Sequence, residues 1–402
     1  FINSSGFDPS LFHDVDGKKY WLNMVWDHRE GHHPFYGIAL QQYDQVQGSL
    51  VGESEIIFKG SKIGLTEGPH MYKRDGFYYL LTAEGGTEYD HAVTLARSKE
   101  ILGPYEVHPQ NPILTSNGDE SLVLQKAGHA SLVETTKGEW YMAHLCGRPI
   151  PGTRRCNLGR ETALQKVEWR EDGWLYLQTD GNFPQHKVAQ PDLPAHSWPD
   201  LPSRLPFDSP HYASPRIKGS LILLEDQKLI LKGGESLESN FEQALYGRRL
   251  TSQRMEATTK MTFKPESFQQ MAGLVLYYNT FLFHYLFLSY DEKKGLCLQI
   301  HSCDDGKSVF PLGSSLVEVG QSDLYLRATL IDSGLQFSWS DDNAIYNNIG
   351  PELDASILSD DYGSRWGFTG TFIALSCQDL TGNQCRAKFD YLDFKTTISE
   401  NE

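Results

Sequence analysis

The sequence lacks the features of a membrane protein and of a nucleic-acid-binding protein. No long apolar run and nothing resembling a signal peptide occurs in its 402 residues. Lysine and arginine number only 36 against 52 acidic residues, for a formal net charge of −16, and the basic patches that phosphate binding needs are absent. These absences argue against nucleic acid and membrane as partners, whereas a neutral ligand is easier to accommodate.

Cysteine and helical periodicity are scarce as well. The six cysteines show no metal-type C-x-x-C spacing, so we interpret them as reduced thiols of core or surface. Cys377 and Cys385 could pair across a turn, which leaves an oxidising compartment open; a cytoplasmic location is the working expectation. With no persuasive helical period, 12% aromatic residues and 36 glycines, the composition predicts a β-rich chain of two domains.

A pattern that occurs three times organises the first half of the chain. Asp8, Glu67 and His129 each precede a short apolar run, a turn glycine and an aromatic strand. The offset from leading residue to turn glycine is nine each time, since 17 − 8, 76 − 67 and 138 − 129 all equal 9. Such a repeat is typical of propeller blades. The three leading residues should therefore face one central axis, the alternative being that they end unrelated hairpins.

Each repeat has room for four strands. We expect them at 9–13, 19–26, 34–42 and 53–58, at 69–73, 77–83, 91–98 and 104–108, and at 130–135, 139–146, 160–169 and 174–179. The long loop from Gly147 to Asn157 should overhang the axis. Because closed propellers have at least four blades, three repeats also suggest that a segment upstream of Phe1 is missing.

Proline density marks the end of the propeller region. Prolines recur between residues 191 and 210 without a period, as in a linker or strap. We place the domain boundary there, with a partial propeller and its strap over 1–204 and a second domain over 205–402. The second domain has many alternating runs, which predict an all-β, two-sheet sandwich.

Five motifs of the first half together resemble the β-xylosidases of glycoside hydrolase family 43. They are Phe7-Asp8-Pro9-Ser10-Leu11, Thr66-Glu67-Gly68-Pro69-His70, Glu84-Gly85-Gly86-Thr87 with His91-Ala92-Val93-Thr94, Gly128-His129-Ala130-Ser131, and Leu158-Gly159-Arg160-Glu161-Thr162. The second half resembles the concanavalin-like sandwich that follows the propeller in one branch of that family, through the stretches 268–279 and 367–372. The resemblance covers essentially the whole chain and implies a propeller of the five-bladed type, of which about three blades are present.

The resemblance implies roles for two carboxylates of an inverting exo-glycosidase that removes terminal β-1,4-xylose, and in some relatives arabinose, from xylo-oligosaccharides. Glu67 matches the general acid. Asp8 matches the aspartate that orients this acid and tunes its pKa. Neither role follows from the spacing alone.

The resemblance also implies sugar-binding residues. Arg160 matches a basic residue that hydrogen-bonds sugar hydroxyls, although it could instead be an ion-pair partner of Glu161 or Glu67. His129 matches an axial histidine that in some relatives accompanies a metal ion or water, so Ca²⁺ is a candidate at the axis, while no cofactor is required; a buried histidine bonded to backbone is equally common. Thr87 would line the pocket, and Phe372 or Phe368 would wall it from the sandwich.

One departure from the family pattern concerns the general base. The family has an aspartate in a Tyr-Pro-Asp-Pro-Ser-like motif well upstream of the second aspartate, and no such segment occurs here. The step of 59 residues from Asp8 to Glu67 matches Asp8 to the second aspartate, with a role as base the alternative. We therefore expect either a β-xylosidase or a non-catalytic sugar-binding relative, and a chain that on its own is unstable or inactive. A homo-oligomer is compatible with the sequence.

Overall fold

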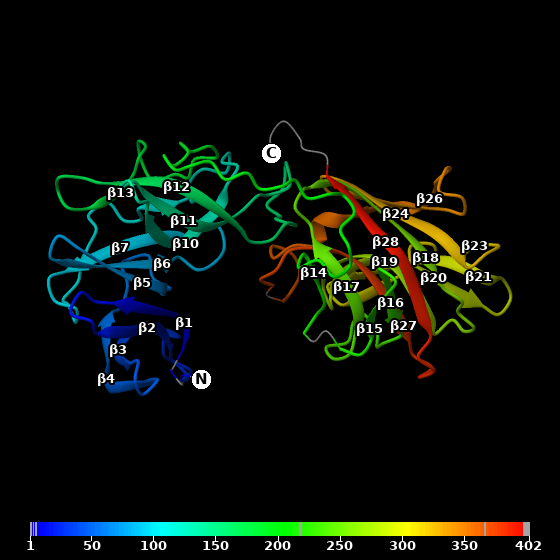
Figure 1. Ribbon diagram of the computed structural model, residues 1–402, viewed down its shortest axis with the longest axis horizontal. Coiled ribbons are helices and arrows are strands. Elements are labelled where there is room, and N and C mark those ends of the chain that lie inside the picture. Colours follow the sequence, from blue (N-terminus) through cyan, green and yellow to red (C-terminus); the bar gives the residue numbers. More distant parts are fainter. Residues whose placement is uncertain (1, 3, 5, 217–218, 366, 397–402) are drawn as a thin grey trace. The chain divides into compact units, whose positions relative to one another are not determined.

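The chain folds into two units whose boundaries do not follow the sequence order (Figure 1). The computed structural model describes residues 2, 4, 6–216, 219–365 and 367–396. The N-terminal unit comprises residues 1–148 and 161–196, and the C-terminal unit comprises residues 149–160 and 197–402. The predicted long loop therefore belongs in large part to the C-terminal unit. No helix in the described ranges has the length and apolar character needed to cross a membrane.

The N-terminal unit contains three antiparallel meanders, which confirm the propeller-type repeat. The first sheet consists of β1 (Phe7–His13), β2 (Lys19–Trp26), β3 (Phe35–Asp44) and β4 (Ser49–Phe58). The second consists of β5 (Glu67–Arg74), β6 (Phe77–Glu84), β7 (Ala92–Ser98), β8 (Glu106–Val107) and, paired with β7, β9 (Leu114–Thr115). The third consists of β10 (Gln125–Glu134), β11 (Trp140–Gly147), β12 (Glu161–Trp169) and β13 (Leu175–Leu177).

A bulge interrupts the first strand of each sheet at a corresponding place. The pairing register shifts between Phe7 and Ser10, between Glu67 and His70, and around His129. Within these bulges the backbone has a positive φ of 53° at Asp8, 57° at Gly68 and 46° at His129. By this criterion Gly68, and not Glu67, is the equivalent of Asp8 and His129.

The hairpin loops explain why the offset of nine residues pairs Glu67, rather than Gly68, with Asp8 and His129. The loops after β1 and β10 span residues 14–18 and 135–139, whereas β5 and β6 are joined by the two-residue turn Asp75-Gly76. A bulge re-aims the side chains beside it, because two residues of one strand then face one residue of its neighbour. Glu67 therefore begins β5 directly before the bulge. It lies one position before Gly68, the residue that corresponds to Asp8 and His129.

Two apolar clusters hold the three sheets side by side. One combines residues of the first and second sheets, and the other combines residues of the second and third. Within the first cluster Leu22 and Ile38 pack with Met71 and Leu80. Because the sheets pack through these faces, β5 contacts both β1 and β10, and the three bulges lie close together.

The C-terminal unit is a two-sheet sandwich, as predicted. One sheet runs in the order β15 (Ile222–Glu225), β16 (Lys228–Lys232), β28 (Arg386–Thr396), β18 (Arg254–Thr262), β24 (Asp323–Ile331), β25 (Gly334–Ser340) and β26 (Asn347–Asp354). The other runs β14 (Tyr212–Ala213), β17 (Ala244–Arg249), β27 (Phe372–Asp379), β19 (Gln270–Asn279), β20 (Leu282–Asp291), β21 (Gly295–Asp304) and β22 (Lys307–Val309), with β23 (Val317–Glu318) paired to β21. A single 3₁₀ turn, η1 (Ala355–Ile357), follows β26.

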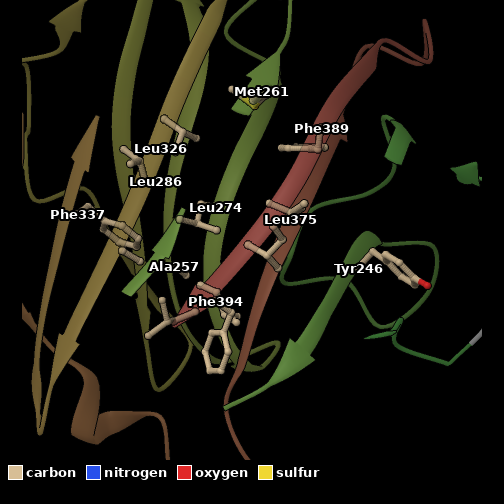
Figure 2. Packing of buried hydrophobic residues seen from close by; sticks show 14 of the residues in the cluster. Tyr246, Ala257, Met261, Leu274, Leu286, Leu326, Phe337, Leu375, Phe389 and Phe394 are labelled. Carbon is tan, nitrogen blue, oxygen red and sulfur yellow. The ribbon is translucent and has the colours of Figure 1, made fainter. Parts of the chain in front are cut away.

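The core of the sandwich lies between these sheets. The alternating burial of β18 and β24 puts every second side chain inside, as the period of a strand requires. Figure 2 shows side chains of both sheets, among them Leu274, Leu375 and Phe389, meeting in this core. Leu158 of the segment 149–160 is part of the same cluster and is 1% exposed.

Candidate active site

The backbone next to Glu67 is where two of the predicted site residues meet. The amide of Gly68 donates a hydrogen bond to Oδ2 of Asp8 at 3.1 Å. A Cβ atom on Gly68 would lie only 2.7 Å from Nε2 of His129, so the imidazole packs directly against this glycine. The structure thus brings Asp8 and His129 together at the residue that follows Glu67.

His70 belongs to the same cluster, although the sequence interpretation gave it no role. Burial lowers the pKa of His70, the charge of His129 lowers it further, and the Asp8 carboxylate acts in the opposite direction. Its imidazole is therefore kept neutral in neutral solution. The signal available in the sequence was its place two residues after Gly68, in the same motif as Glu67.

A buried carboxylate fixes the chain just before Glu67. Glu84 is fully buried at the end of β6 and accepts hydrogen bonds from the amide of Ser61 at 2.8 Å and from Oγ1 of Thr66 at 3.0 Å. The Ser61 hydroxyl also donates to it. Glu67 is thus held between an anchored Thr66 and a Gly68 bound to Asp8, which preorganises its backbone.

A second buried histidine supports the bulge that carries His129. His91 is 1% exposed, and its Nδ1 lies 3.2 Å from the carbonyl oxygen of Lys126. A Cβ atom on Gly128 would lie 2.4 Å from the His91 ring. Only glycine fits between this ring and the β10 backbone, which explains the Gly-His pair of the motif. Thr87 lies half-buried in the loop between β6 and β7.

The remaining predicted residues belong to the C-terminal unit. The Arg160 guanidinium lies 4.3 Å from the centre of the Phe368 ring, a cation–π contact. Glu161, its alternative partner, forms an ion pair with Arg148 at 2.8 Å. Phe372 begins β27 and borders a cavity of about 180 Å³ together with Tyr277, Tyr278 and Thr369, among others. Phe368 is 54% exposed and is thus available to a ligand.

The predicted calcium ion finds no support in the residues around His129. Calcium takes six to eight oxygen ligands, whereas the neighbours of His129 include the imidazole of His70 and the bare backbone of Gly68. Among the described residues no group of three or more His, Cys, Asp or Glu side chains could hold a metal ion. We therefore derive no step from a calcium ion.

Comparison with known protein families identifies both units. Residues 1–175 match the model of glycosyl hydrolases family 43, and residues 209–395 match the β-xylosidase C-terminal concanavalin A-like domain. This chain belongs to glycosyl hydrolase family 43. The predicted glycoside hydrolase with a propeller-type domain and a sandwich is thereby confirmed, and its family needs no cofactor.

Individual relatives of the family 43 chain agree over nearly all of its length. It is 43% identical to a xylan 1,3-beta-xylosidase of Vibrio sp, over 98% of this chain and 76% of that protein. It is 44% identical to xylosidase/arabinosidase 43B of Humicola insolens, with the same coverage. The crystal structure of a xylan beta-1,4-xylosidase from Bacillus halodurans C-125 has 48% identity and a TM-score of 0.95, over 98% of this chain and 77% of that one.

The comparisons do not confirm the expectation that an N-terminal segment is missing, and they leave the roles of Glu67, Asp8, Arg160, Thr87, His129 and Phe372 as predictions. The predicted boundary at 204/205 also stays a prediction. The described structure divides the chain at 196/197 and assigns residues 149–160 to the second unit.

Proposed function

We propose that this protein is an exo-acting β-xylosidase, which hydrolyses terminal β-linked xylose from the non-reducing end of xylo-oligosaccharides with inversion. Support comes from relatives named as xylosidases that are 43–48% identical over 98% of the chain. The observation that carries the assignment of the site is the convergence of Asp8 and His129 on Gly68, directly beside Glu67.

We assign Glu67 as the general acid that protonates the leaving oxygen. An inverting glycosidase needs one protonated carboxyl group at this oxygen and one carboxylate that activates water across the sugar ring, about 6.5 to 9.5 Å away. The Asp8 carboxylate is bound to the amide of Gly68, so it holds the peptide unit that follows Glu67. This arrangement favours an orienting role for Asp8 over a role as base, and we assign the base to no described residue.

Sugar recognition is assigned to the residues that the family resemblance points to. Arg160 and Thr87 would hydrogen-bond hydroxyl groups, His129 would lie beneath the ring, and Phe372 or the more exposed Phe368 would cover an apolar face. Ring stacking and charged hydrogen bonds are the usual means of binding a neutral sugar. No cofactor enters the proposal.

The names of the relatives give three alternatives for the linkage and the sugar. They name β-1,3-xylosidase, β-1,4-xylosidase and arabinosidase activity. We favour β-1,4-linked xylose with arabinofuranose as a side activity. A non-catalytic sugar-binding relative is not favoured, since relatives with 43% and 44% identity carry enzyme names. A cytoplasmic location and a homo-oligomer stay predictions.

The proposal is tested by hydrolysis assays on the purified protein. Rates on 4-nitrophenyl β-D-xylopyranoside and α-L-arabinofuranoside give the sugar preference, and β-1,3- and β-1,4-xylobiose give the linkage. Proton NMR of the first product should show α-xylose, the anomer expected from inversion of a β-linkage. Calorimetric binding of xylose without turnover of any substrate would contradict the proposal and favour a binding protein.

A further inference from the structure

The segment 149–160 is built into the C-terminal sandwich by specific contacts. Nη1 of Arg155 donates to Oγ of Ser356 at 2.7 Å, and its guanidinium lies 4.4 Å from the centre of the Tyr362 ring. The amide of Cys156 donates to Oδ2 of Asp361 at 2.9 Å. The amide of Thr371 donates to the carbonyl oxygen of Asn157 at 3.0 Å. These contacts attach the segment to the loop that leads into β27.

Arg249 completes this attachment at the residues next to Arg160. Its Nη2 donates to the carbonyl oxygens of both Leu158 and Arg160, each at 2.7 Å. Hydrogen bonds from a guanidinium are charge-assisted and stronger than neutral ones. Arg249 ends β17, where its backbone pairs with Phe372 of β27, so the donor stands on a hydrogen-bonded strand of the sandwich.

The backbone between these two carbonyls has no room to shift. Gly159 has a φ of +71°, and a Cβ atom there would lie 1.7 Å from the carbonyl oxygen of Thr369. A Cβ atom on Gly370 would lie 2.2 Å from the carbonyl oxygen of Leu158 and 2.9 Å from Nε of Arg249. The backbone at Gly159 and Gly370 and the side chain of Arg249 thus pack in close contact. This packing fixes the Cα position of Arg160.

We propose that Arg249 is a positioning residue for the family 43 reaction. It fixes the backbone on both sides of Gly159 and thereby sets where the Arg160 guanidinium and its Phe368 partner are presented to the sugar. The sandwich, through Arg249, determines the placement of a sugar-binding arginine that lies in sequence between β11 and β12. The inference rests on the proposed function, since it assumes that Arg160 contacts the substrate.

A double-mutant cycle tests whether Arg249 acts through Arg160. Arg249→Met keeps an unbranched side chain and removes its donors, and we expect a fall in kcat/KM of about 10- to 100-fold, because a misplacement of about 1 Å can cost 100-fold. Most of the fall should appear in KM, as in Arg160→Ala. The double variant should lose no more than about twofold beyond Arg160→Ala. Arg249→Lys, which retains a cationic donor, should recover part of the loss.

Arg254→Met is the matched control, because Arg254 forms a half-buried ion pair with Asp332 on the same sandwich, at 2.9 Å. Its kinetics should stay within twofold of the wild type. Losses in Arg249→Met and Arg160→Ala that multiply in the double variant, or an equal loss in Arg254→Met, would overturn the proposal.

Hydrogen exchange separates this inference from the proposed function. The Gly159 amide donates to the carbonyl oxygen of Cys156 at 2.9 Å within the segment. Its exchange should be at least tenfold faster in Arg249→Met than in the wild type and unchanged in Arg254→Met. Unchanged exchange in Arg249→Met would overturn the inference. A wild-type protein without xyloside turnover would refute the proposed function, while faster exchange would still support the positioning of the Arg160 backbone.

Discussion

Gly68 has no side chain, and this absence allows the His129 ring to approach the backbone beside Glu67. The same glycine offers its amide to Asp8 at 3.1 Å. The sequence pattern drew attention to the stretch around Glu67, because a polar residue before Gly and Pro is distinctive. The repeat aligned Glu67 with Asp8 and His129, whereas the structure aligns Gly68 with them. A bulge adds a residue to the strand without leaving a signature in the hydrophobic pattern.

Glu67→Ala should reduce hydrolysis of xylobiose far more than hydrolysis of 4-nitrophenyl xyloside. A sugar is a poor leaving group that needs the proton, whereas nitrophenolate leaves without it, and general acid catalysis contributes about 10²- to 10⁴-fold. The ratio of kcat/KM values on the two substrates is the measurement. Glu55→Ala, at an exposed position of β4, is the control. Equal losses on both substrates would count against Glu67 as the acid.

Gly68→Ala should impair both stability and activity through the contact with His129. The new Cβ would lie 2.7 Å from Nε2 of His129, in addition to the strain of an alanine at a φ of +57°, which costs about 1 kcal/mol. Gly76→Ala is the matched control, since Gly76 has a φ of +80° and nothing within 4 Å of its Cβ position. Thermal unfolding and xyloside turnover should be affected more in Gly68→Ala. Similar values for both variants would exclude a tight His129 contact.

Elements with a clear period and glycine turns could be predicted well from the sequence. The predicted strands 19–26 and 77–83 nearly coincide with β2 and β6, because each is an aromatic, apolar run that follows a turn glycine. The segment 149–160 could not be assigned in this way. Its attachment to the sandwich depends on single contacts such as Arg249 with Leu158, between residues 91 positions apart.

The loop after β8 should make the N-terminal unit sensitive to acid. His108 is 2% exposed and packs edge-on against Trp174 and Tyr176, and burial lowers its pKa to about 4. Its Nδ1 also accepts a hydrogen bond from the Gln110 amide at 3.0 Å, which protonation would abolish. The unfolded chain takes up a proton near pH 6.5 and the folded chain does not.

The stabilising contribution of neutral His108 is therefore complete above pH 6.5 and is lost as the pH falls toward 4, by at most about 3 kcal/mol. Hydrogen exchange of the Leu175 and Leu177 amides, corrected for intrinsic exchange, should show this decline. His108→Gln, although less stable at pH 7, should have a shallower pH slope. An unaltered slope would show that other groups, such as the buried His144, cause the acid sensitivity.

At the scale of the whole molecule, the two units are joined by more than one connection. The chain passes between them after residues 148, 160 and 196. A boundary placed from proline density alone captures only the last of these passages. Cutting the chain there would remove Leu158 from the sandwich core, together with the partners of Ser356, Asp361 and Arg249.

A fragment of residues 197–402 should accordingly be less stable than the same sandwich in the whole chain. Loss of the buried Leu158 side chain and of its neighbours' hydrogen bonds should cost about 3 to 5 kcal/mol. For a unit of this size, that loss lowers Tm by about 10 °C. A synthetic peptide of residues 149–160 should bind the fragment and raise its Tm as its concentration increases, because a ligand of the folded state stabilises by mass action. The same peptide with Leu158→Ala should raise it much less. Equal unfolding temperatures of fragment and whole-chain sandwich, or equal effects of both peptides, would contradict a structural role for the segment.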